Sequence, residues 1–384
     1  MSISTSLRDI QFTRPWVTGR ELAYIEQAIE SGCVFGNGPF NRRCAAWLRE
    51  HTGAASALTT PSGTHSLELA ALVLGLEVGD EVVMPSFTFV STANAIALRG
   101  AVPVFVDIRA DTLNIDEHQI EQAISDRTRA IVPVHYAGVS CEMDTIMQIA
   151  SDRDIAVIED AAHAIGCSYR GRVLGTIGDL GCLSFDGQKN VTSGEGGALL
   201  LKDSALADMA LNVQAKGTNR AEFLRGEVDC YEWVGLGSSF LPSEITAAFL
   251  AAQLESAEEV NERRRHNWEL YRHQLSGLHS AGRITLPNVP AGCEHNGHLF
   301  YVLLDDPARR PECLDTLKRA GIEAPWHYVP LHRSPAGRRL GRIAGSMAVT
   351  ESSAARLIRL PMHLGLSDDD IAYVVEALHD ALDG

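Results

Sequence analysis

EVVMP (81–85), PVFVDI (103–108), AIVPVHY (130–136) and IAVIED (155–160) are the four short apolar runs that decide the fold of this chain. The segments between them, at 89–100, 118–126 and 143–154, space their apolar residues as helices do. Two more apolar runs follow, GCLSF (181–185) and GALLL (197–201). Apolar, β-branched runs separated by helices predict an α/β fold with a mostly parallel sheet covered on both faces.

The second half of the chain begins with a long helical stretch. From about residue 242 an Ala-rich amphipathic segment continues into a charged one, and α/β patterns resume beyond it. A chain of 384 residues is too long for one compact core of usual size. We therefore predict a large domain over residues 1–255, which includes the N-terminal segment, and a smaller C-terminal α/β domain over 256–384.

Composition excludes several classes of function. The formal net charge of −16 disfavours nucleic acid as a partner, although a helix N-terminus can still hold one phosphate. No two of the eight cysteines have the spacing of a zinc or redox motif, which predicts reduced thiols and no metal site. The N-terminus lacks a signal-peptide pattern, and no apolar run approaches a membrane span. We expect a cytoplasmic protein that does not act at membranes.

Two residues follow strands where ligands of parallel sheets bind, beyond the carboxyl ends. Asp160 ends the run IAVIED, and Lys189 lies in a loop between GCLSF and a Gly-rich turn at 193–197. Each has an ordinary alternative, because Asp160 could simply cap a helix and a loop lysine is usually solvated. A lysine that attacks a carbonyl needs burial or a nearby cation to keep its amine neutral.

Two further signals precede them in the chain. Ser62, Gly63 and Thr64 stand at the start of an apolar helix, where free amides bind phosphate. Phe89 follows the run EVVMP and could stack on a ligand ring. Read singly, these are an ordinary N-cap and a core phenylalanine. Together, the four signals provide what pyridoxal 5′-phosphate (PLP) requires: a phosphate anchor, a ring platform, a carboxylate for the ring nitrogen and an amine for the aldehyde.

The same segments resemble a known family. PSGTHSLELAAL (61–72), residues 79–108, VIEDAAHAIGCSYRG (157–171) and SFDGQKNVTSGEGGALL (184–200) are similar to the DegT–StrS sugar-nucleotide aminotransferases, which are fold-type I PLP enzymes. The resemblance covers nearly the whole chain. Residues 42–48, 132–150 and 216–233 are most similar to 4-aminotransferases acting on dTDP-4-keto-6-deoxy-D-glucose, including the dTDP-4-amino-4,6-dideoxygalactose transaminases and calicheamicin-type antibiotic-sugar relatives.

The resemblance implies cofactor roles for particular residues. Lys189 would carry PLP as a Schiff base, Asp160 would pair with the pyridine nitrogen, and His163 would lie beside the phenolic oxygen. Phe89 would stack on the ring. The phosphate would be held by Ser62, Gly63, Thr64 and Ser184. The resemblance also implies a homodimer whose active sites are shared between subunits.

Two positions depart from the family pattern. Asp186 stands where relatives usually carry His, three residues before the lysine, and it is expected to influence how substrate is held. Ser239 stands where many relatives place an Asn from the partner subunit on the phosphate, and the dideoxygalactose-type enzymes share this serine. Substrate contacts are expected from Arg220 and Arg225, although surface arginines are an equal alternative, and the resemblance places His327, Tyr328 and His332 along the sugar pocket. A zinc site at His327 and His332 is disfavoured, because no third ligand accompanies them.

The predicted reaction is transfer of the amino group of L-glutamate to C4 of dTDP-4-keto-6-deoxy-D-glucose, by way of pyridoxamine phosphate (PMP), with Lys189 as proton carrier. Transfer to a C3 ketone is the alternative within the enzyme class. A C3 dehydratase is disfavoured because those enzymes replace the lysine with His. A regulatory protein that binds PLP without turnover is the alternative from another class. A nicotinamide enzyme lacks its G-x-G-x-x-G motif here.

Overall fold

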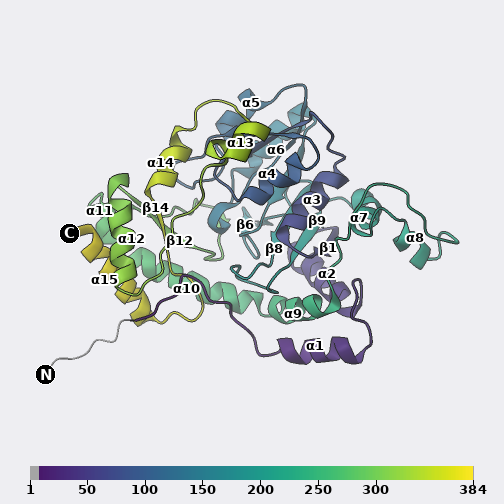
Figure 1. Ribbon diagram of the computed structural model, residues 1–384, viewed down its shortest axis with the longest axis horizontal. Helices are drawn as coiled ribbons and strands as arrows, with labels where there is room; N and C mark the ends of the chain where they lie inside the picture. Colours follow the sequence, from purple (N-terminus) through teal and green to yellow (C-terminus); the bar gives the residue numbers. More distant parts are fainter. Residues whose placement is uncertain (1–7, 384) are drawn as a thin grey trace.

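A central eight-stranded sheet organises the molecule (Figure 1), which we describe from a computed structural model over residues 8–383. Its strand order is β1-β9-β8-β5-β4-β2-β3-β13. The strands are β1 (Ser56–Thr60), β2 (Glu81–Pro85), β3 (Val102–Val106), β4 (Thr128–Ile131), β5 (Ala156–Asp160), β8 (Leu180–Ser184), β9 (Gly197–Leu201) and β13 (Arg342–Ile343). Only β9 runs against its neighbours, β1 and β8, so the prediction of a mostly parallel sheet is confirmed.

Both faces of the sheet are covered, because consecutive strand residues enter two different cores. Val82 and Met84 pack in one apolar cluster with Leu69 of α3, while Val83 packs in the other with Ile146 of α6. The helices of this part are α1 (Glu21–Glu30), α2 (Pro39–Thr52), α3 (Gly63–Val73), α4 (Val90–Ala97), α5 (Ile120–Ala123), α6 (Met143–Arg153), α7 (Ala207–Gln214), α8 (Arg220–Leu224) and α9 (Glu244–Leu254). Two faces buried in this way explain why the strands read as continuous apolar runs.

Most predicted elements are present, with three differences. The run predicted as a strand over 130–136 is strand only to Ile131, the end of β4, and its last residue begins a 3₁₀ turn. Residues 118–126 form only the short helix α5 after a 3₁₀ turn, and the helical stretch from 242 is interrupted. The backbone leaves α9 at Glu255 and re-enters a helix as α10 (Ala257–Gln274), with α11 (Ser276–Ser280) after it. Helical periodicity continues across such a break, so the pattern alone did not reveal it.

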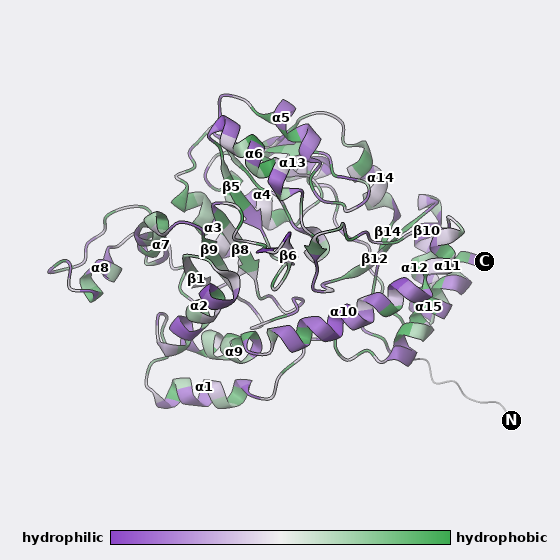
Figure 2. Cartoon of the chain, turned by 180° about the vertical axis from the view of Figure 1, so that it is seen from behind, coloured by the Kyte–Doolittle hydropathy of each residue, from purple (hydrophilic) through white to green (hydrophobic). Residues whose placement is uncertain are grey.

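The C-terminal region has a sheet and a core of its own. The antiparallel sheet β10-β12-β14 packs with the paired helices α12 and α15 beside α10 (Figure 2). Its elements are β10 (Ile284–Thr285), β12 (Phe300–Leu304), β14 (Leu357–Leu360), α12 (Arg310–Arg319), α13 (Pro335–Leu340), α14 (Ala348–Arg356) and α15 (Asp368–Asp383). Ile10 is buried in this core, so residues 8–12 pack here and not on the large sheet.

Three smaller features complete the description. A minor sheet joins β6 (Ser168–Tyr169), β7 (Arg172–Val173) and β11 (Cys293–Glu294). Residues 216–238, here called the arm, carry α8 away from the body (Figure 1). Within residues 8–383 no helix is long and apolar enough to cross a membrane. The prediction that the N-terminus carries no signal peptide concerns residues that begin the chain, and residues 1–7 of that segment lie outside the described residues.

Candidate active site

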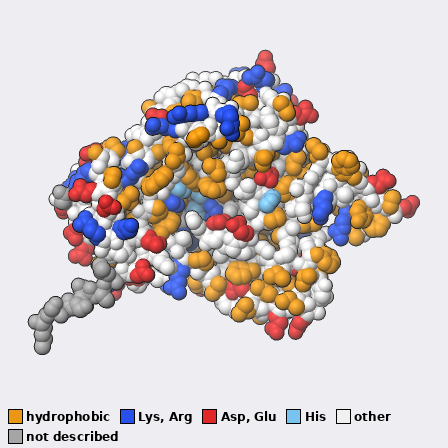
Figure 3. Space-filling view, in the orientation of Figure 1, with side chains coloured by type: hydrophobic (Ala, Val, Ile, Leu, Met, Phe, Trp, Pro, Cys, Tyr) orange, Lys and Arg blue, Asp and Glu red, His pale blue; other side chains and the backbone are white. Residues whose placement is uncertain are grey.

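A cavity of about 670 Å³ opens between the carboxyl-end edge of the large sheet and the C-terminal region. It appears as the central hollow in Figure 3, where histidine and basic side chains are visible. Eleven of the residues predicted from the sequence line it: Ser62, Gly63, Thr64, Phe89, Asp160, His163, Ser184, Asp186, Lys189, His327 and Tyr328. Because parallel strands end at one edge, residues distant in the chain converge there.

The N-terminus of α3 forms one end of the cavity. Ser62 caps the helix, its Oγ accepting from the His65 amide at 3.1 Å, and the first-turn amides of Gly63 and Thr64 have no intrahelical acceptor. The Thr64 hydroxyl lies 2.7 Å from that of Ser91. Free amides, hydroxyls and the positive end of a helix together suit a phosphate group.

Two glycines allow α3, β8 and β9 to approach one another closely at this end of the cavity. A Cβ on Gly63 would lie 2.7 Å from the Cβ of Ser184 at the end of β8. A Cβ on Gly197 would lie 2.4 Å from the carbonyl oxygen of Ser62. Both approaches are shorter than side-chain contacts tolerate, so these positions require glycine to bring α3, β8 and β9 together.

Asp160 ends β5 at the centre of the cavity and is only 5% exposed. Its Oδ2 accepts from Thr92 Oγ1 at 2.7 Å, and its Oδ1 accepts from the amide of Ala162 at 3.2 Å. Burial raises the pKa of Asp160 above its ordinary value, although these two bonds and the charge of Lys189 oppose the shift. Among residues 8–383 no cationic side chain forms an ion pair with it.

Lys189 lies on a short turn that follows β8. Its amide donates to the carbonyl of Asp186 at 2.9 Å, and the Asp186 carboxylate accepts from the amide of Gln188 at 2.9 Å. The next residue, Asn190, ties the turn to α10 through Asn261 and to the carbonyl of Asn296. Burial lowers the pKa of the Lys189 amine, and the charges of Asp186 and Asp160 oppose that shift. A lowered pKa increases the neutral fraction that attacks carbonyls and accepts protons.

His163 is buried beside this amine. Its Nδ1 accepts from the Ala137 amide at 3.3 Å, so in the neutral ring the proton resides on Nε2. Burial, and next the charge of Lys189, lower the pKa of His163 well below its ordinary value, which keeps the ring neutral. The ring of His298 lies against it, tilted by 30° and with 4.2 Å between centroids. His163 thus has one N–H available as a donor.

Aromatic side chains form the remaining walls. Phe89 is 58% exposed although it lines the cavity, and its ring centroid is 6.5 Å from that of Tyr328. The rings of His327 and Tyr328 stack at 3.5 Å, and His327 Nδ1 is 2.8 Å from the hydroxyl of Tyr136. A flat ring or sugar therefore meets aromatic faces held by buried contacts.

His332 does not line the cavity as expected, because its ring is held between Ser86 and Glu351. Three further predicted residues, on or beside the arm, also lie outside the cavity of their own chain. Ser239 is exposed at the base of the arm and bridges to Ala215. Arg220 begins α8 on the arm, and Arg225 ends it, paired with Asp208 and Glu227. The structure of one chain therefore does not bring these three to the other site residues.

Sequence reasoning missed several cavity residues, including Thr92, Arg264, His298 and Arg359. Thr92 lies in the segment 85–95 that was singled out for Phe89, so its position one helical turn after Phe89 was a usable signal. The other three come from elements between residues 257 and 360 with no motif, and only the folded chain brings them to the cavity.

The cavity fits PLP on the observations above. A buried carboxylate without a cationic partner, Asp160, suits a protonated pyridine nitrogen, since a cation offsets the cost of burying the charge. The space beside Gly63 at the start of α3, which any side chain would fill, suits a phosphate. An exposed Phe89 and an amine with a lowered pKa complete the match.

Comparisons with known proteins agree with this assignment. A model of the DegT/DnrJ/EryC1/StrS aminotransferase family matches residues 16–379. The spore coat polysaccharide biosynthesis protein SpsC of Bacillus subtilis is 33% identical over 387 residues, which cover 98% of this chain and 97% of SpsC. Two solved structures are also similar over nearly their whole lengths.

The first is Spr1654 of Streptococcus pneumoniae, described as a proposed sugar aminotransferase and solved in PLP and PMP forms. Its PLP form has a TM-score of 0.89 and 27% identity, over 98% of this chain and 99% of that one. The second is DesI, solved in the presence of its TDP-sugar product, with a TM-score of 0.87 and 29% identity over 97% and 93% of the two chains.

The fold and the cavity thus define a fold-type I PLP-dependent aminotransferase. The chain belongs to the DegT/DnrJ/EryC1/StrS aminotransferase family, and it is a sugar aminotransferase.

Proposed function

We propose that this enzyme transfers the amino group of L-glutamate to the C4 ketone of dTDP-4-keto-6-deoxy-D-glucose, giving a dTDP-4-amino-4,6-dideoxyhexose. The observation that carries the proposal is the cavity in which Lys189, Asp160 and His163 meet beside the aromatic pair His327 and Tyr328. The similarity to DesI, whose product is a TDP-sugar, supports a dTDP-linked substrate. The resemblance of residues 42–48, 132–150 and 216–233 to C4 enzymes supports the position of transfer.

PLP, when bound, supplies an aldehyde that exchanges amines and a ring that accepts an electron pair. Lys189 Nζ would hold the cofactor at rest and would accept and return the proton of the donor's α-carbon. Asp160 supplies the negative charge that keeps the ring nitrogen protonated. His163 donates from Nε2 to the phenolic oxygen and fixes the ring's orientation. A positioned proton carrier such as Lys189 contributes about 10²–10⁴-fold.

The other cavity residues bind and orient. Ser62, Gly63, Thr64 and Ser184 hold the phosphate at the start of α3, and Phe89 covers one face of the ring and excludes water from it. Asp186, besides closing the turn before Lys189, has one carboxylate oxygen free of hydrogen bonds with the described residues and contacts the sugar through it. His327 and Tyr328 line the sugar side.

The arm carries the remaining predicted contacts to a second subunit. Five of its side chains are apolar and more than half exposed: Leu224, Tyr231, Trp233, Val234 and Leu236. Burying such side chains against a second copy stabilises a dimer. In that homodimer Ser239 reaches the partner's cofactor phosphate, and Arg220 and Arg225 lie near the partner's nucleotide diphosphate. With the predicted domain boundary between residues 255 and 256, the arm belongs to the large domain.

The decisive experiment incubates the PLP-loaded enzyme with L-glutamate and dTDP-4-keto-6-deoxyglucose and follows the product by NMR. An amine on C4 is expected, and the ring couplings give its axial or equatorial configuration. A matched incubation with a 3-keto sugar nucleotide tests transfer to C3. Formation of PMP without any amino sugar would overturn the substrate, and failure to form PMP from glutamate would overturn the donor.

A further inference from the structure

His298 lines the same cavity as Lys189 but has no role in the proposed reaction. It is 7% exposed, and its Nδ1 lies 3.0 Å from the side-chain oxygen of Asn190, the residue that follows Lys189. The ring of His163 lies 4.2 Å from it between centroids. The protonation of an imidazole decides which hydrogen bonds it can form, so the tautomer of His298 determines what it offers the cavity.

The hydrogen bonds of Asn190 fix the tautomer of His298. The side-chain nitrogen of Asn190 donates to the backbone carbonyl of Asn296 at 2.9 Å and to the side-chain oxygen of Asn261 at 2.9 Å. A backbone carbonyl can only accept, so the atom of Asn190 beside it is the nitrogen, and the atom that faces His298 is the oxygen. His298 Nδ1 therefore carries a hydrogen and donates it to Asn190.

The other ring nitrogen of His298, Nε2, is consequently a hydrogen-bond acceptor. Burial, and next the charge of Lys189, lower the pKa of His298 well below its ordinary value, so the ring is neutral and Nε2 keeps its lone pair. Nε2 forms no hydrogen bond within residues 8–383, and Nδ1 is engaged by Asn190, which leaves the far end of the ring for the cavity. His163 has the opposite tautomer, with its hydrogen on Nε2. The cavity thus presents one imidazole donor and one imidazole acceptor.

A buried hydrogen-bonded network fixes His298 relative to the lysine turn. Asn190, Asn261 and Asn296 are each no more than 5% exposed, and their bonds join that turn to α10 and to the segment that carries His298. Networks of this kind make a buried region rigid. The acceptor therefore has a fixed place near the backbone of Lys189, whereas the amine of Lys189 ends a flexible four-carbon chain.

We propose that His298 positions the free amine of Lys189 by accepting one of its N–H groups at Nε2. This inference rests on the proposed function, in which Lys189 is released from the cofactor in each cycle and carries a proton. A neutral amine has two N–H groups and one lone pair, so a hydrogen bond to His298 turns the lone pair toward the cofactor. Because His298 acts through Lys189, it is a positioning residue.

Two substitutions separate the two ends of the ring. His298→Asn keeps a donor where Nδ1 lies and removes the acceptor at Nε2, whereas His298→Gln places an amide oxygen where Nε2 lies. His295→Asn is the matched control. His295 lies on the same segment, outside the cavity, and its Nδ1 accepts from the amide of Gly297 at 3.2 Å.

The first measurement follows formation of the C=N bond between Lys189 and the PLP aldehyde, with release of one water, after cofactor-free protein is mixed with PLP. Stopped-flow absorbance is expected to show a limiting rate constant about 10- to 50-fold lower in His298→Asn, with half-saturation by PLP within about twofold of wild type. His298→Gln is expected to recover to within about fivefold of wild type, and His295→Asn to match it. A normal rate constant in His298→Asn would overturn the proposal. So would equal losses of rate and thermal stability in His298→Asn and His298→Gln, which would indicate a purely structural role.

A double-mutant cycle tests whether His298 acts through Lys189. In the PLP-loaded enzyme, single-turnover formation of PMP from L-glutamate is expected to slow about 10- to 50-fold in His298→Asn, with half-saturation by glutamate unchanged. In the slow residual reaction of Lys189→Ala, adding His298→Asn is expected to cost no more than about twofold. A further loss of about tenfold in the double variant would show that His298 acts directly on cofactor or substrate, and would overturn the positioning role.

Failure of the proposed function would give a different result. A wild-type enzyme that forms the lysine adduct but no PMP from L-glutamate would overturn the donor, while the rates of C=N bond formation would still decide His298. Normal rates in His298→Asn beside an inactive Lys189→Ala would overturn only the role of His298.

Discussion

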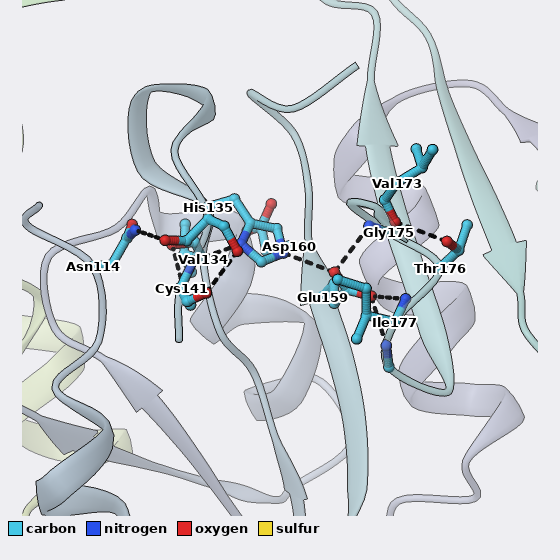
Figure 4. A network of polar contacts seen from close by, with 12 residues as sticks. Asn114, Val134, His135, Cys141, Glu159, Asp160, Val173, Gly175, Thr176 and Ile177 are labelled. Atoms are coloured by element: carbon cyan, nitrogen blue, oxygen red, sulfur yellow. Dashed lines mark hydrogen bonds and ion pairs between the residues drawn. The ribbon is translucent and has the colours of Figure 1, made fainter. Parts of the chain in front are cut away.

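Two adjacent carboxylates at the end of β5, Glu159 and Asp160, face opposite sides of the strand and have opposite electrostatic surroundings. Glu159 accepts from the amides of Gly175, Ile177 and Gly178 and lies 2.8 Å from His135 Nε2 (Figure 4). These bonds outweigh burial, so the pKa of Glu159 is lowered. Asp160, with two donors and no ion pair among the described residues, has a raised pKa.

The two carboxylates of this strand therefore differ in role: Glu159 stabilises the fold, and Asp160 belongs to the candidate active site. Glu159 is satisfied by the protein itself, and its charge holds the loop at 175–178 against β5. Asp160 has no such compensation among the described residues, and in the proposed function the protonated ring nitrogen of PLP would supply it. Buried polar groups are normally satisfied, so the deficient one indicates a ligand.

The largest effect is expected from a substitution in the cavity, on the side of the strand where Asp160 lies. Lys189→Ala is expected to reduce transamination by more than about 10³-fold, because it removes the amine that we propose holds PLP and carries the proton. The PLP absorbance band of the lysine adduct should disappear, and borohydride reduction should no longer attach cofactor to the 181–197 peptide. Thermal stability without cofactor should stay close to wild type. A variant that retained full turnover would exclude Lys189 from both roles.

Asp160→Asn should give the next largest effect on turnover with little effect on folding. Removing the charge opposite the ring nitrogen is expected to lower kcat about 10²–10³-fold. Because the folded-state pKa of Asp160 is raised, its ionised form costs stability above its unfolded pKa near 3.8. The cofactor-free variant should therefore be as stable as wild type, or more so, at pH 7. Marked destabilisation in a denaturant titration would contradict this interpretation.

Glu159→Gln should show the reverse pattern. Losing a buried charge with four donors is expected to destabilise the fold by about 3 kcal/mol at pH 7. The folded-state pKa of Glu159 is lowered, so its contribution is complete above its unfolded pKa near 4.5 and declines as pH falls below that value. The difference in unfolding free energy between wild type and Glu159→Gln should thus shrink from pH 6 to pH 3. A constant difference across this range would refute the electrostatic explanation.

The smallest expected effect tests the one side-chain bond that Asp160 receives from residues 8–383, that of Thr92. Thr92→Val removes the 2.7 Å donor while keeping shape, and should lower kcat about 3- to 10-fold. The bond lowers the pKa of Asp160, so the acid limb of the pH–rate profile should move to higher pH. Thr88→Val, one turn earlier, removes only the bond between the two hydroxyls and serves as control. An unmoved acid limb would show that Thr92 does not tune Asp160.

Local pattern predicted the large sheet well and the C-terminal half less well. EVVMP (81–85) and GALLL (197–201) coincide with β2 and β9, because strands buried on both faces are continuously apolar. The break between α9 and α10 was missed, since helical spacing is the same on either side of it. Strand ends also located Asp160 and Lys189, because the edge where parallel strands end is fixed by topology.

The site shows the same division. The sequence alone determined the mostly parallel sheet and the position of Ser62, Gly63, Thr64, Asp160 and Lys189 at its edge, because each of these residues lies directly beside a strand or helix end that local pattern reveals. Tertiary structure alone decided that Thr92 supports Asp160, that Asn190 fastens the lysine turn to α10, and that Arg359 lines the cavity. The contacts of Thr92 and Asn190 each join residues roughly 70 positions apart. Assembly of the large sheet brings Thr92 to Asp160, and packing of α10 and the C-terminal region against the sheet edge brings α10 to Asn190 and Arg359 to the cavity.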